Sequence, residues 1–204
     1  LVRLIEAFLR HGEKQLIDAI LKRRVPSLGL PIDTGVVVLN VGTALAVYEA
    51  VQKNKPLIDG IVTVTGKCMT EQRNFKLRVG TSFETIMYAI GGFPKDAVKL
   101  VNGGPMMGKA VSKMEAASVK STSALLLLTE EETRRGKEGN CIRCAKCVDA
   151  CPMGLEPYLL NRLSRASRLE DLELNMVHDC IECGCCMYTC PANIPLLDTI
   201  RLSK

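Results

Sequence analysis

Two cysteine runs of the same spacing decide the interpretation of this sequence: Cys141-Ile-Arg-Cys144-Ala-Lys-Cys147-Val-Asp-Ala-Cys151-Pro152 and Cys180-Ile-Glu-Cys183-Gly-Cys-Cys186-Met-Tyr-Thr-Cys190-Pro191. Each run reads C-x2-C-x2-C-x3-C-P, the bacterial pattern for iron–sulfur ligation. Three thiolates at this spacing can wrap one loop around three corners of a cubane, and the proline stops the chain from continuing as a helix after the fourth. The pattern predicts a module that moves single electrons.

The fourth cysteine of such a run ligates the other cluster when two runs are paired. The spacing therefore predicts two [4Fe–4S] clusters with crossed ligands. The first is assigned to Cys141, Cys144, Cys147 and Cys190, and the second to Cys180, Cys183, Cys186 and Cys151. Cys185 is left over between two ligands, and we expect it to be a small residue that packs near the cluster.

Other uses of these cysteines are less consistent with the pattern. Zinc ribbons also pair C-x2-C motifs, but a structural zinc takes four ligands and needs no third cysteine with a C-P ending. Crowded C-x2-C spacing would strain a disulfide, and nothing in the sequence indicates secretion. The only cysteines outside the eight are Cys68 and Cys185, which points to a reducing cytoplasm.

The composition of the 204 residues is that of a globular protein, 47% hydrophobic and 24% charged. This length suits one large domain or two to three small ones. No stretch reaches the roughly eighteen apolar residues of a membrane span. No signal peptide is expected, and Leu1 in place of a start Met suggests a fragment. Aromatic residues are 4% with no Trp, so nucleic-acid binding is not expected. The triplet Lys22-Arg23-Arg24 suits a solvated helix end, with a docking face for an acidic partner as the alternative.

The first third of the chain has helical and strand-like patterns. Apolar spacing over residues 1–24 predicts two amphipathic helices that break near His11-Gly12. The run Val36–Leu39 predicts a buried parallel strand, and it leads into the turn Asn40-Val41-Gly42-Thr43 and a helix over 44–51 that Thr43 would cap. A strand, a glycine turn and a helix N-terminus could bind a phosphate or flavin, although most such turns are structural.

The middle of the chain predicts a small β-grasp-like unit. Strands are expected at 61–65 and 74–79 as a hairpin, then a helix over 83–90 capped by Thr81-Ser82, and strands at 98–101 and 121–128. Thr129–Glu132 resembles a capped helix start. Helices over 157–169 and around 172–176 would bracket the cysteine runs, an arrangement closer to the α-helical ferredoxin module than to the small bacterial ferredoxin. His178 is expected at the surface, with tuning of a cluster as the alternative.

Several motifs occur together in one order: Gly12-Glu-Lys-Gln-Leu16, Arg24-Val-Pro26, Gly29-Leu-Pro31, Asn40-Val-Gly-Thr43, Val62-Thr-Val-Thr-Gly66, Gly103-Gly-Pro-Met-Met-Gly108 and both cysteine runs. With these motifs the sequence resembles the C component of the Rnf (Rsx) electron-transport complex, a relative of the flavin-binding subunit of respiratory complex I. The fold class implied is α+β. It comprises a remnant of an α/β FMN- and NADH-binding domain (1–56), a soluble-ligand-binding β-grasp (SLBB) domain (57–128) and a two-cluster ferredoxin domain (129–204).

The resemblance also implies binding residues. Gly12 and Glu13 match a Gly-Glu segment near the nucleotide, and Asn40, Gly42 and Thr43 match a turn that touches FMN. The family's N-terminal region, with its glycine-rich flavin and NADH loop, is missing from this sequence. We therefore expect weak or no FMN binding and no NADH oxidation by this chain alone, and no catalytic residue is assigned.

The function implied is an electron relay between an NADH/FMN site and further carriers of an ion-translocating NAD:ferredoxin oxidoreductase. Its partners would be the other proteins of that complex and a redox protein such as ferredoxin. Its location would be the bacterial cytoplasm, peripheral on the cytoplasmic face of the inner membrane. The alternatives are a corrinoid (cobalamin) reductase of bacterial microcompartments and a non-catalytic Fe–S or zinc interaction module.

Overall fold

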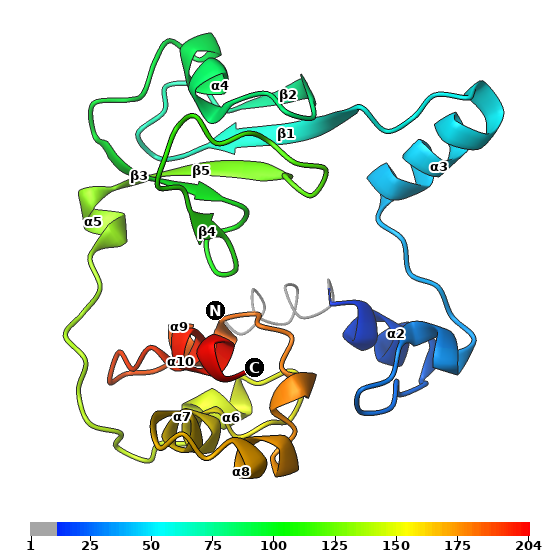
Figure 1. Ribbon diagram of the computed structural model, residues 1–204. Coiled ribbons are helices and arrows are strands. Elements are labelled where there is room, and N and C mark those ends of the chain that lie inside the picture. The colour runs from blue at the N-terminus through cyan, green and yellow to red at the C-terminus, as the bar shows by residue number, and fades with distance from the viewer. Residues whose placement is uncertain (1–11) are drawn as a thin grey trace. The chain divides into compact units, whose positions relative to one another are not determined.

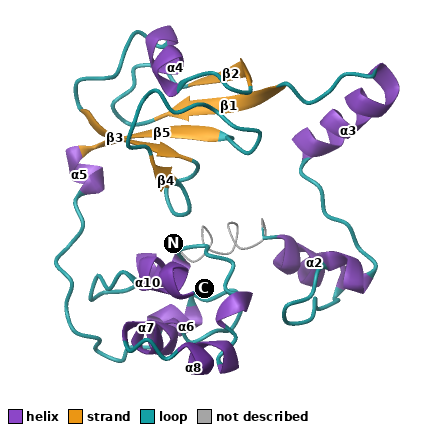
Figure 2. Cartoon of the chain, viewed as in Figure 1, coloured by secondary structure: helices purple, strands orange, loops and turns teal. Residues whose placement is uncertain are grey.

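A computed structural model describes residues 12–204 as a mixed α+β protein (Figure 1). The chain forms two compact units. One comprises Leu39–Arg135 and holds a five-stranded sheet; the other joins the N-terminal segment up to Val38 to the helical region Gly136–Lys204 (Figure 2). The helix expected before Gly12, together with His11, lies outside the described residues.

The sheet has the strand order β2-β1-β5-β3-β4. β1 and β2 form the expected antiparallel hairpin, whereas β5 lies between β1 and β3 and runs parallel to β1. Because β5 pairs with strands far away in the sequence, its place was not predictable from local pattern. The strands are β1 (Asp59–Thr65), β2 (Arg73–Arg78), β3 (Ala97–Asn102), β4 (Lys109–Ala110) and β5 (Ala124–Thr129).

Helix α4 (Phe83–Ala89) contributes buried side chains to the core of this unit, together with the strands. It begins where the backbone N–H of Thr85 donates to the side chain of Ser82 at 3.2 Å, as the sequence predicts. The core contains Val62, Val64, Phe83, Ile86, Met87, Ala97, Leu100, Leu125 and Leu127. Helix α5 (Glu130–Thr133) follows β5 with a capping box between Thr129 and Glu132.

Two expectations for residues 36–43 are wrong. The run Val36–Leu39 forms no strand, and Val37 is 67% exposed. A strand needs a neighbour for its backbone groups, and the sheet of this structure is built from other segments. Helix α3 (Val41–Lys53) begins earlier than expected: its cap is Asn40, not Thr43, because the Asn40 side chain accepts from the Gly42 N–H at 2.8 Å.

The second unit is built from short helices. Its core contains Leu155, Leu160, Leu163, Leu172, Val177 and Ile200. The elements are α2 (Glu13–Leu21), η1 (Pro31–Thr34), α6 (Lys146–Asp149), α7 (Pro157–Arg165), α8 (Leu169–Leu174), η2 (Val177–Asp179), α9 (Cys185–Tyr188) and α10 (Leu196–Ser203). Helix α7 ends four residues before the predicted limit, because the chain turns through Ser167 at φ 55°.

The N-terminal segment packs on this helical unit through a few defined contacts. Asp179 accepts hydrogen bonds from the Ser27 hydroxyl and from the Leu28 N–H, the latter at 3.1 Å. Although partial burial opposes ionisation of Asp179, these hydrogen bonds hold its pKa below the usual value. Gln15 donates to the sulfur of Met153 at 2.7 Å, and Ile17 of α2 is buried. Across the described part of the chain, no helix combines the length and apolar character needed to cross a bilayer.

Candidate metal centres

The two cysteine runs fold into loops of the same backbone shape. Each cysteine of the second run lies 39 positions after its counterpart in the first, as Cys141 and Cys180 illustrate. Left-handed residues occur at matching places: Arg143 and Ala145 at φ 58° and 59°, and Glu182 and Gly184 at φ 56° and 80°. Non-glycine residues are uncommon in this conformation, and such strain clusters at functional sites. Short helices follow both loops, α6 in the first and α9 in the second.

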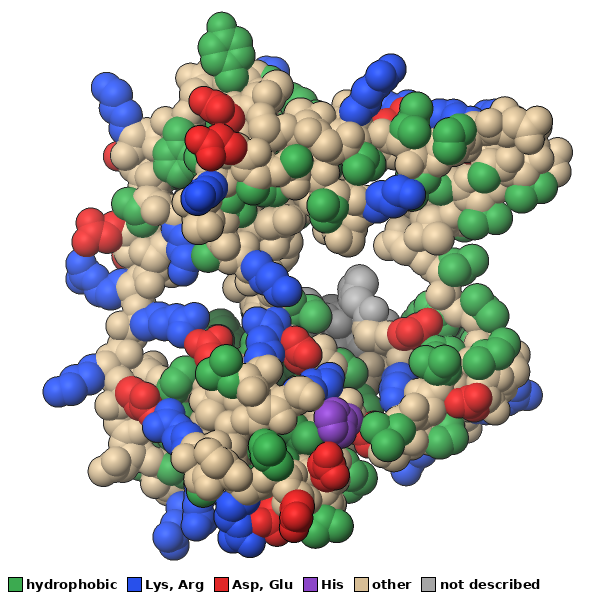
Figure 3. All heavy atoms as spheres, in the orientation of Figure 1, with side chains coloured by type: hydrophobic (Ala, Val, Ile, Leu, Met, Phe, Trp, Pro, Cys, Tyr) green, Lys and Arg blue, Asp and Glu red, His purple; other side chains and the backbone are tan. Residues whose placement is uncertain are grey.

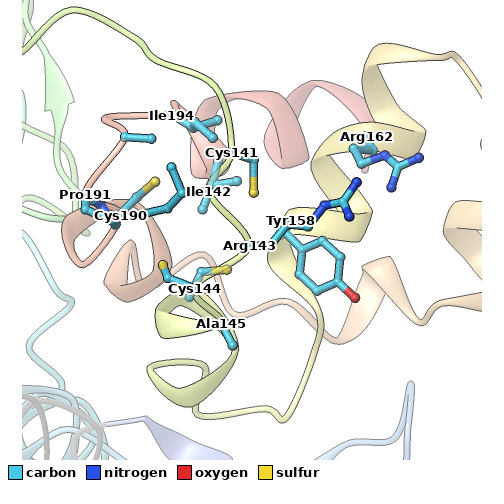
Figure 4. Close-up of a pocket in the computed structure, with 13 residues that line it drawn as sticks. Cys141, Ile142, Arg143, Cys144, Ala145, Tyr158, Arg162, Cys190, Pro191 and Ile194 are labelled. Carbon is cyan, nitrogen blue, oxygen red and sulfur yellow. The ribbon is translucent and has the colours of Figure 1, made fainter.

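Four cysteines line a cavity of about 410 Å³ (Figure 4). They are Cys141, Cys144, Cys147 and Cys190, three from the first run and the last from the second. Cys141 and Cys144 are exposed, and the residue between them, Ile142, is 67% exposed. This first cavity therefore opens directly to solvent along the loop that supplies three of its thiols.

The other four cysteines of the two runs line a second, much smaller cavity of about 20 Å³. They are Cys151, Cys180, Cys183 and Cys186, again with one drawn from the other run. None of them is exposed, and the rest of the lining is apolar apart from backbone, with Leu155, Leu160, Leu197 and Ile200 all buried. The two quartets are the sets that the crossed-ligand pattern predicts.

Burial also sets the acidity of several of these thiols. It raises the pKa of Cys147 in the first cavity and of Cys151 and Cys180 in the second. It raises the pKa of Cys186 to about 12, with the neighbouring thiols Cys180 and Cys183 adding to the effect. Thiolates are the form that ligates metal, so cluster binding must displace these protons.

The donor sets fit iron–sulfur clusters. Among residues 12–204, no group of three or more His, Cys, Asp or Glu side chains converges closely enough to hold one metal ion. In the first cavity the four thiols instead surround a space, which is what a polynuclear cluster requires. All-thiolate ligation is the donor chemistry of [4Fe–4S] clusters.

Three other residues singled out in the sequence are not lining residues of these cavities. Cys185 is fully buried but lines neither of them, and burial raises its pKa to about 12. His178 is exposed in η2. Cys68 is half-buried in the other unit, where burial raises its pKa and its thiol lies 3.9 Å from the Leu127 carbonyl oxygen.

The residues matched to FMN and NADH binding do not form one site in either unit. Gly12 and Glu13 belong to the N-terminal segment at the start of α2, whereas Asn40, Gly42 and Thr43 begin α3 in the unit Leu39–Arg135. Neither of the two cysteine cavities, nor either of two further cavities in the unit with the sheet, is lined by any of the five.

The charged residues near the two cavities differ, and the sequence interpretation missed this difference. Arg143 and Arg162 line the first cavity, and no carboxylate does. Their counterparts 39 positions later are Glu182 and Arg201, which form an ion pair at 2.9 Å. Lys204 lies 3.5 Å from the same Glu182. An alignment of one run on the other would have revealed the change from Glu to Arg.

Comparison with known proteins bears directly on these cavities. Residues 61–110 match the SLBB domain family, and residues 140–194, which include all eight cavity cysteines, match the 4Fe-4S dicluster domain family. The C component of the Na(+)-translocating ferredoxin:NAD(+) oxidoreductase complex of Acetobacterium woodii is 41% identical over 193 residues, 95% of this chain and 44% of that protein. The chain is homologous to the C component of these complexes.

Two other C components give the same result. That of the proton-translocating ferredoxin:NAD(+) oxidoreductase complex of Clostridium ljungdahlii is 44% identical over 76% of this chain and 34% of its own length. That of the ion-translocating oxidoreductase complex of Rhodobacter capsulatus is 41% identical over 95% of this chain and 37% of its own length. The chain thus spans less than half the length of these relatives. The predicted resemblance to the Rnf C component is confirmed.

Proposed function

We propose that this chain is an electron-relay region of the C component in an ion-translocating ferredoxin:NAD(+) oxidoreductase, with two [4Fe–4S] clusters as its carriers. The observation that carries the proposal is the sorting of eight cysteines into two cavities, each lined by three thiols of one run and one of the other. When bound, such clusters take up and release single electrons.

The chain's own residues would hold the two sites together and pack apolar side chains behind them. Each cavity takes its fourth cysteine from the other run, Cys190 in the first cavity and Cys151 in the second. A cluster in either cavity would therefore link both loops. Buried side chains at matching positions, Leu155 and Ile194, pack behind the loops. An apolar shell of this kind limits solvent access and thereby influences the reduction potential.

The rest of the chain supports a wider assignment. We infer a β-grasp domain at 57–128, since β1 and β5 run parallel in the middle of the sheet beside α4. We assign 129–204 to an α-helical ferredoxin domain and 1–56 to the trailing part of an FMN- and NADH-binding domain. In a protein of the relatives' length, Gly12, Glu13, Asn40, Gly42 and Thr43 would contribute to that flavin and nucleotide site.

The partners follow from the same assignment. Other proteins of the complex and a ferredoxin would exchange electrons with this chain. The protein would be peripheral on the cytoplasmic face of the bacterial inner membrane, as part of a membrane-bound assembly.

Iron analysis of the anaerobically purified chain tests the proposal. We expect about eight irons and eight sulfides per chain and a visible spectrum that dithionite bleaches reversibly. Zinc in place of iron, or clusters that resist reversible reduction, would contradict the electron-relay function.

Pairs of substitutions test the crossed ligation. Cys141→Ala with Cys190→Ala removes two thiols from one cavity and should leave about four irons. Cys141→Ala with Cys151→Ala removes one thiol from each cavity and should leave few or none. If each run held its own cluster, these two results would be interchanged.

A further inference from the structure

We propose that the mouth of the first cavity is a docking surface for an acidic protein that carries a one-electron redox centre. The surface consists of Ile142, Arg143, Tyr158 and Arg162, which line that cavity together with its four cysteines. In Figure 4, Arg143, Tyr158 and Arg162 lie on one side of the labelled cysteines. The inference rests on the proposed function, because only an electron carrier needs close approach to this site. The charge, exposure and chemistry of these residues suit an acidic redox protein.

The charge changes between equivalent positions of the two halves. In the second half of the module, Glu182 pairs with Arg201 at 2.9 Å and lies 3.5 Å from Lys204. In the first half the corresponding positions hold Arg143 and Arg162, so two positive charges occur where the fold elsewhere places an ion pair. No ion pair is found for either arginine among the described residues. Such a local excess of one charge selects a partner of the opposite charge.

The mouth of the first cavity is exposed to solvent. Arg143, Arg162 and the thiols Cys141 and Cys144 are exposed, and Ile142 presents 67% of its surface to solvent. No thiol of the second cavity is exposed. Arginine, tyrosine and an exposed aliphatic side chain are the residue types that anchor protein interfaces. A partner that covered this mouth would approach the first cluster without an intervening layer of protein.

The basic character is local to this part of the surface. Over residues 136–204 acidic and basic side chains are nearly equal in number. Figure 3 shows both basic (blue) and acidic (red) side chains over the lower part of the molecule. The carboxylates Glu170, Asp171 and Glu173 lie on α8 and are not among the lining residues of the cavity. The acidic neighbours on elements beside the cavity are Asp149 of α6 and Glu156, which accepts from the Tyr158 hydroxyl at 3.3 Å.

Binding is measured without electron transfer by titrating the full chain with an acidic [2Fe–2S] ferredoxin whose iron is replaced by gallium. We expect the double variant Arg143→Glu with Arg162→Glu to bind more weakly, with a dissociation constant raised roughly tenfold or more at low ionic strength. Added salt should weaken binding to the unchanged chain and remove most of the difference. Basic cytochrome c serves as a control redox protein of opposite charge. It should bind the double variant no less tightly than the unchanged chain.

Arg24→Glu is the matched control. Arg24 is an exposed arginine of the same unit, lies in the basic triplet near α2 and lines neither cysteine cavity. It should leave ferredoxin binding within twofold of the unchanged chain. An equal loss with Arg24→Glu, or no loss with the double variant, would overturn the docking surface.

A second measurement separates this inference from the proposed function. Iron content and reversible bleaching by dithionite should be the same in the double variant and the unchanged chain. If the two arginines only offset the charge of the cluster, the reduction potential would shift while ferredoxin binding stayed constant, and the docking surface would be wrong. Absence of redox-active clusters in the unchanged chain would instead contradict the proposed function, whatever the binding result.

Discussion

The two cysteine loops have the same backbone conformation but differ in the side chains that surround them. Left-handed residues, short helices and cysteines recur at matching positions in both halves. The first cavity is wide, lined by two arginines and bordered by exposed cysteines, whereas the second is small, apolar and lined by no exposed cysteine. Ligand spacing therefore specifies the loop, and the residues between and behind the ligands specify what each site faces.

The largest expected effect comes from removing one buried thiol. Cys186→Ala and Cys147→Ala should each reduce the iron content to about four per chain. Cys186 is 8% exposed and belongs to a buried cluster with Ile194 and Leu196, so its loss should also destabilise the fold more than the loss of Cys147. Iron assay with urea unfolding of both variants measures the difference. Equal unfolding midpoints would contradict the contrast between a buried and an open half.

Metal removal should separate the two sites by rate. A chelator such as bathophenanthroline reaches the first cavity through exposed Cys141 and Cys144, while the second cavity has no exposed thiol. We expect two phases of bleaching of similar amplitude, with the fast phase roughly tenfold faster because solvent access controls the attack. The variant with Cys141→Ala and Cys190→Ala should retain only the slow phase. Retention of only the fast phase would reverse the assignment of the open site.

Alkaline pH should destabilise the cluster-free protein through its buried thiols. Cys186 has a pKa of about 12 when folded, against about 8.5 for an unperturbed cysteine. The folded state therefore keeps a proton that the unfolded state releases above about pH 8.5, and stability falls as pH rises toward the folded pKa by about 1.4 kcal/mol per pH unit for one such thiol.

Urea unfolding of the cluster-free protein under anaerobic conditions, between pH 7 and about pH 9.5, measures this loss of stability. Cys186→Ala should reduce the dependence on pH, because it removes one of the titrating thiols. The cluster-loaded protein should show little of this dependence, since its ligating thiols are already deprotonated. A cluster-free protein as stable at the upper pH as at pH 7 would contradict the prediction.

The smallest expected effect concerns the extra cysteine of the second loop. Cys185 is fully buried and lines neither cavity, so Cys185→Ser should leave about eight irons per chain. The buried hydroxyl should lower the free energy of unfolding by about 1–2 kcal/mol. A loss of about four irons would show that Cys185 is a ligand and that the regular spacing misassigns the second site.

Local patterns predicted most of the elements. The hairpin of β1 and β2, the Ser82 cap of α4 and the capping box at Thr129 agree with the sequence interpretation. These features depend on alternation or on hydrogen bonds between residues three apart, so neighbouring residues suffice to specify them. The sequence interpretation places the cap of α3 three residues late, at Thr43 rather than Asn40, because both residue types can cap.

The failures concern interactions between distant residues. The run at 36–39 has the composition of a buried strand, but whether it pairs depends on a neighbour that its own residues do not specify. The short strand β4 and the parallel pairing of β5 with β1 were missed for the same reason.

The donor chemistry of this protein can be read from its amino-acid sequence. The spacing of each cysteine run predicts the ligands and the crossing of the fourth one, and the structure brings the two predicted quartets into two cavities. The packing of distant segments sets the rest: one cavity has exposed cysteines and is lined by Arg143 and Arg162, while the other has no exposed cysteine, and Glu182 of its loop is paired with Arg201. Exposure and charge pairing depend on which distant side chains pack around a site, and the spacing of its ligands does not encode them.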